Sequence, residues 1–157
     1  MWVKQAGVND ITVDLIFDGQ CGFCTRSVNW IQRLDRHSRV RLHPSQRLAV
    51  RDRFGLTEDD IQSAAWAFVA GQRTAGEGAI NLALDAALGT RVFTVLHRLP
   101  GVRWAQERAY RWVSDHRYLL RGVVPWCSQH PDDCELAVEG ATCSLPTANG
   151  ASPRCTD

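Results

Sequence analysis

The residues best suited to chemistry are two cysteines near the start of the chain. Cys21 and Cys24 fall in the segment Phe17–Cys24, which has the sequence FDGQCGFC. If a helix begins at Cys21, the unpaired N–H groups and the positive dipole end of its first turn favour a thiolate over a thiol. Cys24 then lies about one turn further along and can form a disulfide with Cys21. The spacing therefore predicts a dithiol that cycles between reduced and oxidised states.

The position of each group in this helix predicts its role. We expect Cys21, nearer the exposed helix start, to attack a substrate disulfide, and Cys24, about one turn deeper, to resolve the mixed disulfide. Asp18 is a candidate to accept the proton of the resolving thiol or to bind backbone amides at the helix start. A role as an ordinary turn residue explains Asp18 equally well.

The elements around the motif follow from hydrophobic periodicity. Residues 11–17 alternate as a strand does, residues 18–20 form a turn, and a helix fits residues 21–35. Further along, the same criteria predict strands at 39–43, 64–70 and 73–75, a helix cap at Thr57, and helices at 44–54, 78–88, 91–99 and 103–116, the last two separated by Pro100-Gly101. This order predicts an α/β fold: a thioredoxin-like mixed sheet flanked by helices, with a C-terminal helical extension and a cysteine-rich tail. We place the domain at residues 1–122 and the loop-rich tail at 123–157.

Composition narrows the class of protein. With 157 residues and a net charge of +1, the chain has room for one substantial core and no overall attraction to nucleic acid or to an acidic membrane. No stretch approaches the ~20 apolar residues of a membrane-spanning helix, and no secretory signal is visible, so we expect a cytoplasmic location. In that reducing compartment six cysteines favour catalysis, metal binding or reduced thiols over a disulfide framework. No nucleotide-binding loop is present, and we expect no cofactor and no metal.

At Asp18, Cys21 and Cys24 the chain resembles the DCC family of thiol–disulfide oxidoreductases, named for an Asp-x-x-Cys-x-x-Cys motif. The resemblance covers about residues 11–127. Beyond the motif it lies in the preceding strand, Val40–Gln46, Gly78-Ala79, Tyr110–Val113, His116–Tyr118 and Gly122–Cys127. It implies a thioredoxin-like fold and a redox enzyme of the protein-disulfide reductase type. The implied partners are a disulfide-containing protein or small-molecule thiol and a redox recycling partner that the resemblance does not name.

One feature departs from thioredoxins in general. They place a cis-proline just before the third strand, where it binds the substrate backbone. Here residues 61–64 are Ile-Gln-Ser-Ala, without proline. We therefore expect substrate docking to differ from that of thioredoxins.

Other interpretations of the cysteines stay open. Cys21 and Cys24 could bind zinc together with Cys127 and Cys134, or with His130, because four such ligands complete a tetrahedral site. The tail cysteines could be reduced thiols without a role or could form disulfides, and Cys127 could exchange with Cys21 as a third functional thiol. These tail cysteines are Cys127, Cys134, Cys143 and Cys155.

The segment Arg91–Arg121 holds seven arginines against Glu107 and Asp115. One hypothesis is a binding module that grips an acidic protein or nucleic acid with this segment. Another is that the acidic tail, Cys127–Asp157, folds back over it. We interpret Trp66, Trp104 and Trp112 as core residues and His43 as a surface histidine. We therefore expect neither nucleic acid nor a membrane as a partner.

Overall fold

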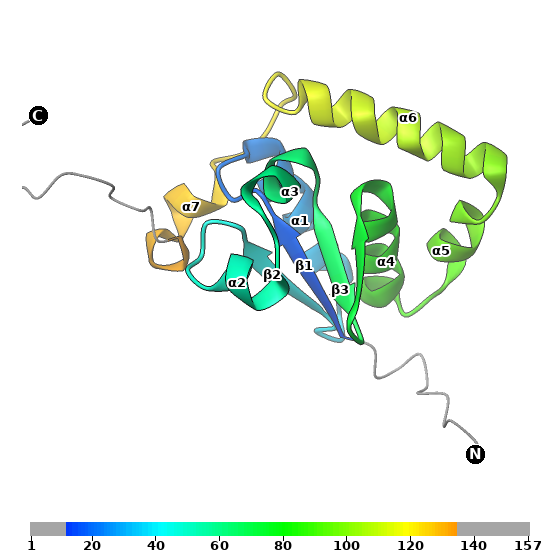
Figure 1. Cartoon of the computed structure of the whole chain (residues 1–157), viewed down its shortest axis with the longest axis horizontal. Coiled ribbons are helices and arrows are strands. Elements are labelled where there is room, and N and C mark those ends of the chain that lie inside the picture. The colour runs from blue at the N-terminus through cyan, green and yellow to red at the C-terminus, as the bar shows by residue number, and fades with distance from the viewer. Residues whose placement is uncertain (1–11, 135–157) are drawn as a thin grey trace, which may run out of the picture.

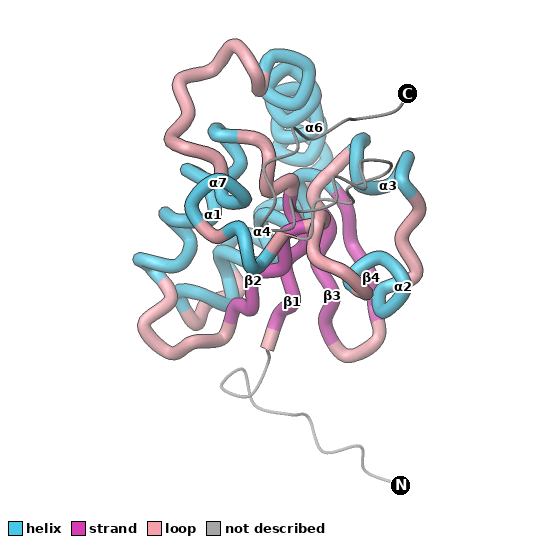
Figure 2. The backbone as a smooth tube through the Cα atoms, turned by 90° about the vertical axis from the view of Figure 1, so that its left-hand side faces the viewer, coloured by secondary structure: helices cyan, strands magenta, loops and turns pink. Residues whose placement is uncertain are grey.

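The computed structural model describes residues 12–134, which form a four-stranded sheet flanked by helices (Figure 1). The strand order is β2-β1-β3-β4, and the strands lie side by side in Figure 2. The strands are β1 (Val13–Phe17), β2 (Val40–Pro44), β3 (Trp66–Val69) and β4 (Gln72–Ala75). β1 runs parallel to β2 and antiparallel to β3, so the sheet is mixed. The predicted α/β, thioredoxin-like arrangement is confirmed.

β1 supplies the core with side chains on both faces. Leu15 and Phe17 belong to the cluster that packs against α1 (Gly22–Leu34) and α4 (Gly76–Leu88). Ile16 points the other way, into a second cluster that also contains residues of α2 (Val50–Phe54) and α3 (Glu58–Ser63). Because alternate side chains of a strand face opposite sides, helices cover both faces of the sheet.

Two local predictions around β2 are wrong. The helix expected at 44–54 is limited to α2, because Pro44 is still paired with Phe17 in the β1–β2 ladder and the Ser45 N–H donates to the Phe17 carbonyl at 2.9 Å. His43 is not at the surface. It is 8% exposed, and its Nε2 lies 2.8 Å from a carboxylate oxygen of Asp14.

Two further helices, α5 (Val92–His97) and α6 (Pro100–His116), follow α4 and pack against it. α5 ends before Pro100, as the sequence predicts, but α6 begins at Pro100 and not at Arg103, because the first turn of a helix needs no N–H from its first residue. Trp104 and Trp112 are 65% and 57% exposed, so the prediction that both are core residues is wrong. Both occupy the outer face of α6.

Polar contacts fix the position of α6. The Tyr110 hydroxyl accepts the backbone N–H of Ala65, just before β3, at 3.0 Å. The Gln106 Oε1 accepts from the Asn81 side chain of α4 at 2.9 Å and lies 2.8 Å from His97 Nδ1 in α5. These contacts place the inner face of α6 opposite the start of α1. None of the helices within residues 12–134 is long and apolar enough to cross a membrane.

Candidate active site

The cysteine motif forms the start of α1. Cys21 is the residue that caps this helix, with an extended backbone at φ −90° and ψ 115°. Its sulfur accepts the backbone N–H of Cys24 at 3.2 Å, as the side-chain oxygen of a serine or aspartate does at other helix starts. This N–H and the helix dipole both favour a negative charge on Cys21. The turn and helix predicted for residues 18–35 are therefore in place.

The two thiols of the motif differ in ionisation. The Cys24 thiol donates a hydrogen bond to the Cys21 sulfur and, with the Cys24 backbone N–H, lowers the pKa of Cys21 to about 6 against the opposing effect of burial. The same thiol–thiol hydrogen bond raises the pKa of Cys24, and burial raises it further. At neutral pH the reduced pair therefore holds a Cys21 thiolate and a Cys24 thiol.

The exposure of the two sulfurs is the reverse of the predicted order. Cys21 is buried, with only 1% of its surface exposed. Cys24 is half-buried and lines a cavity. The prediction of an exposed Cys21 and a deeper Cys24 is therefore wrong, because a segment about a hundred residues downstream lies against the motif.

We call this segment, Arg121–Cys127, the strap. In Figure 1 the chain passes from α6 over the start of α1 to α7 (Trp126–Gln129). The Val123 N–H donates to the Gly22 carbonyl at 3.1 Å, and the Cys127 N–H donates to the Gly19 carbonyl at 3.0 Å. The strap is thus bonded to the chain on both sides of Cys21.

Small residues allow this close approach. A Cβ atom on Gly22 would overlap the Val123 carbonyl, and one on Gly122 would overlap the backbone of Gly22. The Trp126 N–H also donates to the Thr25 hydroxyl of α1 at 2.9 Å. Backbone contact between the strap and α1 therefore depends on glycine at both positions.

A disulfide and an ion pair hold the end of the strap. Cys127 is bonded to Cys134, just after a 3-10 helix, η2 (Pro131–Asp133). Asp133 lies 2.6 Å from Arg47 and accepts a hydrogen bond from the indole of Trp126 at 3.2 Å. Of the tail's two described acidic residues, Asp133 therefore pairs with Arg47 and not with the Arg91–Arg121 segment.

These contacts narrow the interpretations of the tail cysteines. Of the alternatives for Cys127 and Cys134, the structure contains the disulfide. Neither sulfur is therefore available as a thiolate ligand for zinc. Within residues 12–134, no group of three or more His, Cys, Asp or Glu side chains is placed to hold a metal ion. Cys143, Cys155 and the rest of the acidic tail lie outside the described residues. The division into a domain at 1–122 and a tail at 123–157 stays a prediction.

Asp18 is bonded on both of its carboxylate oxygens. Its Oδ1 accepts from the Gln20 N–H at 2.9 Å and from the Gln46 amide at 3.0 Å. Its Oδ2 accepts from the Tyr118 hydroxyl at 3.2 Å and lies 4.0 Å from Arg117. The Gln20 bond is that of an ordinary Asx turn. The other three contacts connect Asp18 to distant parts of the chain.

The predicted site omitted the side chains that surround Asp18 and Cys24. Gln46, Arg117 and Tyr118 contact Asp18, and Tyr110 joins α6 to Ala65. Each of these four residues falls in a segment that carries the family resemblance, as do the strap residues from Gly122 onward. The segments that resemble the family could therefore have indicated these site residues, since the fold brings those segments together around the motif.

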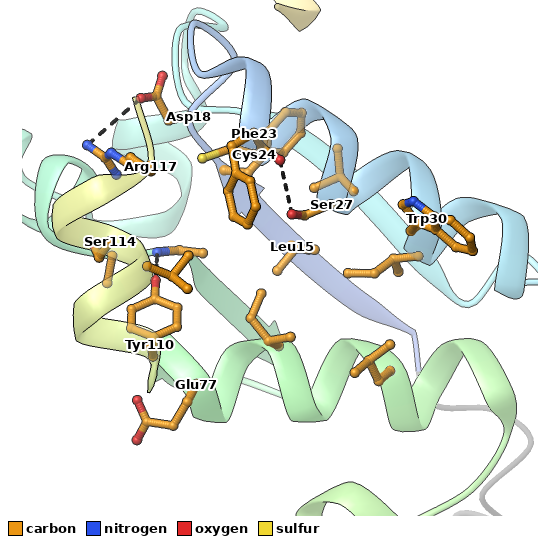
Figure 3. Close-up of a pocket in the computed structure, with 18 of the residues that line it drawn as sticks. Leu15, Asp18, Phe23, Cys24, Ser27, Trp30, Glu77, Tyr110, Ser114 and Arg117 are labelled. Carbon is orange, nitrogen blue, oxygen red and sulfur yellow. Dashed lines mark hydrogen bonds and ion pairs between the residues drawn. The ribbon is translucent and has the colours of Figure 1, made fainter. Parts of the chain in front are cut away.

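A cavity of about 540 Å³ lies beside the motif, on the side of Cys24. Figure 3 shows it between α1 and α4, with Tyr110, Ser114 and Arg117 on a third side. Leu15 of β1 forms part of its wall. Asp18 and Arg117 lie at the end where Cys24 presents its sulfur. Together the fold and the dithiol at a helix start define a thioredoxin-like redox protein.

The comparison with protein families agrees with this class. The family model of the DCC1-like thiol-disulfide oxidoreductases matches residues 15–123. The chain therefore belongs to this family, which confirms the resemblance seen in the sequence. Comparisons with curated proteins and with solved structures found no match.

Proposed function

We propose that the protein exchanges disulfides through the Cys21–Cys24 pair, with Cys21 as the nucleophile and Cys24 as the resolving thiol. The observation that carries this proposal is the place of the Cys21 sulfur at the start of α1, where it accepts the backbone N–H of Cys24 at 3.2 Å. This contact and the neighbouring Cys24 thiol lower the pKa of Cys21, and the thiolate is the form that attacks disulfides.

The exchange takes two displacements. The Cys21 thiolate attacks one sulfur of a substrate disulfide, so that a Cys21–substrate disulfide forms and the other substrate sulfur leaves as a thiolate. Cys24 then loses its proton and attacks the Cys21 sulfur, which releases the second substrate thiol. The products are two substrate thiols and a Cys21–Cys24 disulfide. Four sulfur atoms suffice for this reaction, and a recycling thiol returns the pair to its reduced form.

Asp18 is our candidate for the base that receives the Cys24 proton. It lines the same cavity as Cys24, and its negative charge raises the pKa of both cysteines. A nearby carboxylate can take up the proton directly or through a water molecule. The Tyr118 and Gln46 contacts orient the carboxylate for this role.

A substrate can reach Cys21 by either of two routes. Because Cys21 is buried beside the strap, its sulfur meets a substrate when the Val123–Gly22 contact opens or when the substrate enters from the Cys24 side. The implied partners are a disulfide-containing protein or small-molecule disulfide and a thiol that recycles the pair. The proposed location is the cytoplasm, where such thiols are abundant, and Cys127–Cys134 is then a disulfide of a kind that is rare in that compartment.

Two serine variants test the proposal. Cys21→Ser should abolish reduction of a disulfide such as bis(2-hydroxyethyl) disulfide, because the attacking thiolate is lost. Cys24→Ser should accumulate a mixed disulfide on Cys21, because the resolving thiol is lost. Mass spectrometry of quenched reactions identifies both products. A mixed disulfide that instead accumulates on Cys24 in Cys21→Ser, with full activity, would reverse the proposed roles.

A further inference from the structure

The cavity beside the motif is large enough to bind a small molecule. Its volume of about 540 Å³ lies within the range of small-molecule sites, which are mostly apolar with a few polar groups. The walls come from three helices and β1. Apolar side chains that form them include Phe23, Trp30, Ile31, Leu84 and Val113.

Most of the polar groups that line the cavity have partners within the protein, whereas Glu77 has only His97, at 4.0 Å. Asp18 faces Arg117, and the Asn81 amide donates to Gln106 at 2.9 Å. The Ser27 hydroxyl donates to the Phe23 carbonyl at 3.0 Å. An anionic ligand would lose its hydration without gaining a free positive charge, because Arg117 already lies beside Asp18, whereas an apolar ligand loses little. The cavity therefore favours a neutral, apolar occupant.

An extended peptide, by contrast, cannot pair with Ala65, the residue just before β3. The N–H of Ala65 donates to the Tyr110 hydroxyl at 3.0 Å. The carbonyl of Ala65 accepts the N–H of Gly76 at 2.9 Å. Both hydrogen-bonding groups of this residue are therefore used within the protein. The strap lies along the other side of the motif, where it contacts Gly19 and Gly22.

We propose that the cavity binds the organic group of a small, neutral, largely apolar disulfide, and that such disulfides are the substrate class of the Cys21–Cys24 pair. This inference rests on the proposed function and adds the substrate to it. The ligand's sulfur atoms lie at the end of the cavity lined by Cys24 and Asp18, and its carbon skeleton extends between α1 and α4 (Figure 3).

The chemistry balances with Cys24 and Asp18, which line this end of the cavity, and with Cys21, which does not line it but accepts the Cys24 N–H at 3.2 Å. Attack by the Cys21 thiolate breaks the sulfur–sulfur bond of the ligand and forms a Cys21–ligand disulfide. Asp18 takes the proton of the Cys24 thiol and passes it to the leaving thiolate, which becomes a neutral thiol. The resulting Cys24 thiolate attacks Cys21 and expels the second half of the ligand as a thiolate, which takes a proton from water. The ligand gains two electrons, and the dithiol loses two.

A matched pair of variants in α4 tests the inference. Leu84 lines the cavity, whereas Leu88, one turn further along, is exposed. The assay compares 4,4′-dithiodipyridine, which is neutral and aromatic, with bis(2-hydroxyethyl) disulfide, each rate being divided by that of the same disulfide with free glutathione. Leu84→Trp should lower the normalised rate with 4,4′-dithiodipyridine about tenfold relative to that with bis(2-hydroxyethyl) disulfide, because the larger side chain fills space that the aromatic ligand needs. Leu88→Trp should leave the ratio of the two normalised rates unchanged.

The outcomes separate this inference from the proposed function. If both disulfides are reduced and the ratio is the same in the two tryptophan variants, the cavity is not the substrate site, although the dithiol is active. If neither disulfide oxidises the Cys21–Cys24 pair in the wild type, the proposed function fails and this inference with it. Should Leu84→Trp fail to fold, Ser114→Leu repeats the test from α6, with Asp115→Leu as its exposed control.

A second variant tests the exclusion of peptides. Tyr110→Phe removes the acceptor of the Ala65 N–H and makes this group free to bind a substrate backbone. Reduction of the insulin disulfides should therefore be slow in the wild type, on the normalised scale, and faster in Tyr110→Phe. A wild-type protein that reduces insulin as readily as the aromatic disulfide would overturn the proposed substrate class.

Discussion

The first turn of α1 separates two different environments, one for each sulfur of the motif. On the strap side, Gly22 and Thr25 are bonded to a segment that a disulfide and an ion pair hold in place. On the cavity side, Cys24 and Phe23 face apolar side chains across an open volume. Cys21 belongs to the closed side and Cys24 to the open side.

This contrast concerns ionisation as well as access. Burial raises the pKa of both cysteines, but the largest influence on each is the hydrogen bond between the two thiols, which lowers the pKa of Cys21 and raises that of Cys24. The hydrogen bonds decide which thiol ionises, because Cys24 donates to Cys21 and Cys21 donates nothing in return. The two sulfurs therefore have different roles. Cys21, on the strap side, carries the negative charge, and Cys24, on the cavity side, lies where a ligand can enter.

The largest expected effect concerns the donor on Cys24. In wild-type protein the thiolate absorbance at 240 nm should titrate with a midpoint near pH 6, the pKa of Cys21. Cys24→Ala removes the thiol donor and should move this midpoint up towards the ordinary cysteine value of about 8.5. Cys24→Ser keeps a donor at the same position and should stay closer to the wild type. A wild-type midpoint near 8.5 would contradict the assigned hydrogen bond.

The same ionisation predicts how stability of the reduced protein depends on pH. The pKa of Cys21 is lowered to about 6 in the folded protein, so its contribution is complete above the unfolded value of about 8.5 and is lost as the pH falls towards 6. The pKa of Cys24 is raised, so this residue destabilises the fold above about pH 8.5. The free energy of unfolding in urea should therefore rise between pH 6 and 8 and decline at higher pH. In Cys21→Ser the rise should disappear.

A smaller effect is expected when the closed side is forced open. Gly22→Ala places a Cβ atom against the Val123 carbonyl and should lower the free energy of unfolding by about 1–3 kcal/mol, as overpacking does. It should also speed alkylation of Cys21 by iodoacetamide, because the strap is displaced. Gly101→Ala is the control, since a Cβ atom there meets nothing within 4 Å. Equal alkylation rates in the two variants would mean that the strap does not shield Cys21.

The smallest effects come from the two charges that flank the motif. Arg117 lowers and Asp18 raises the pKa of Cys21. Arg117→Met should therefore move the 240 nm midpoint up and Asp18→Asn should move it down, each by a fraction of a pH unit, because these charges act over a longer distance than the hydrogen bonds. Arg111→Met, an exposed change in α6, should leave the midpoint unchanged. Shifts of the same sign for Arg117→Met and Asp18→Asn would be inconsistent with a Coulombic effect.

Several local features of this protein are predicted by the sequence alone. The alternation of residues 11–17 predicts β1, the turn at Asp18 and the cysteine spacing predict the start of α1, and Thr57 predicts the capping box of α3 that the structure contains. Each depends on interactions within a few residues, which propensity and periodicity report directly. The mixed sheet follows from the order of such elements.

Only the tertiary structure decided which thiol is covered and which faces a cavity. The strap lies against the Cys21 motif, and the Tyr110 hydroxyl accepts the N–H of Ala65. Both come from segments far along the chain, where residue spacing gives no information about contact. For the same reason Trp104 and Trp112 read as core in the sequence and lie outside in the fold. Hydrophobic periodicity reports which face of a helix is apolar, but only packing determines whether anything covers that face.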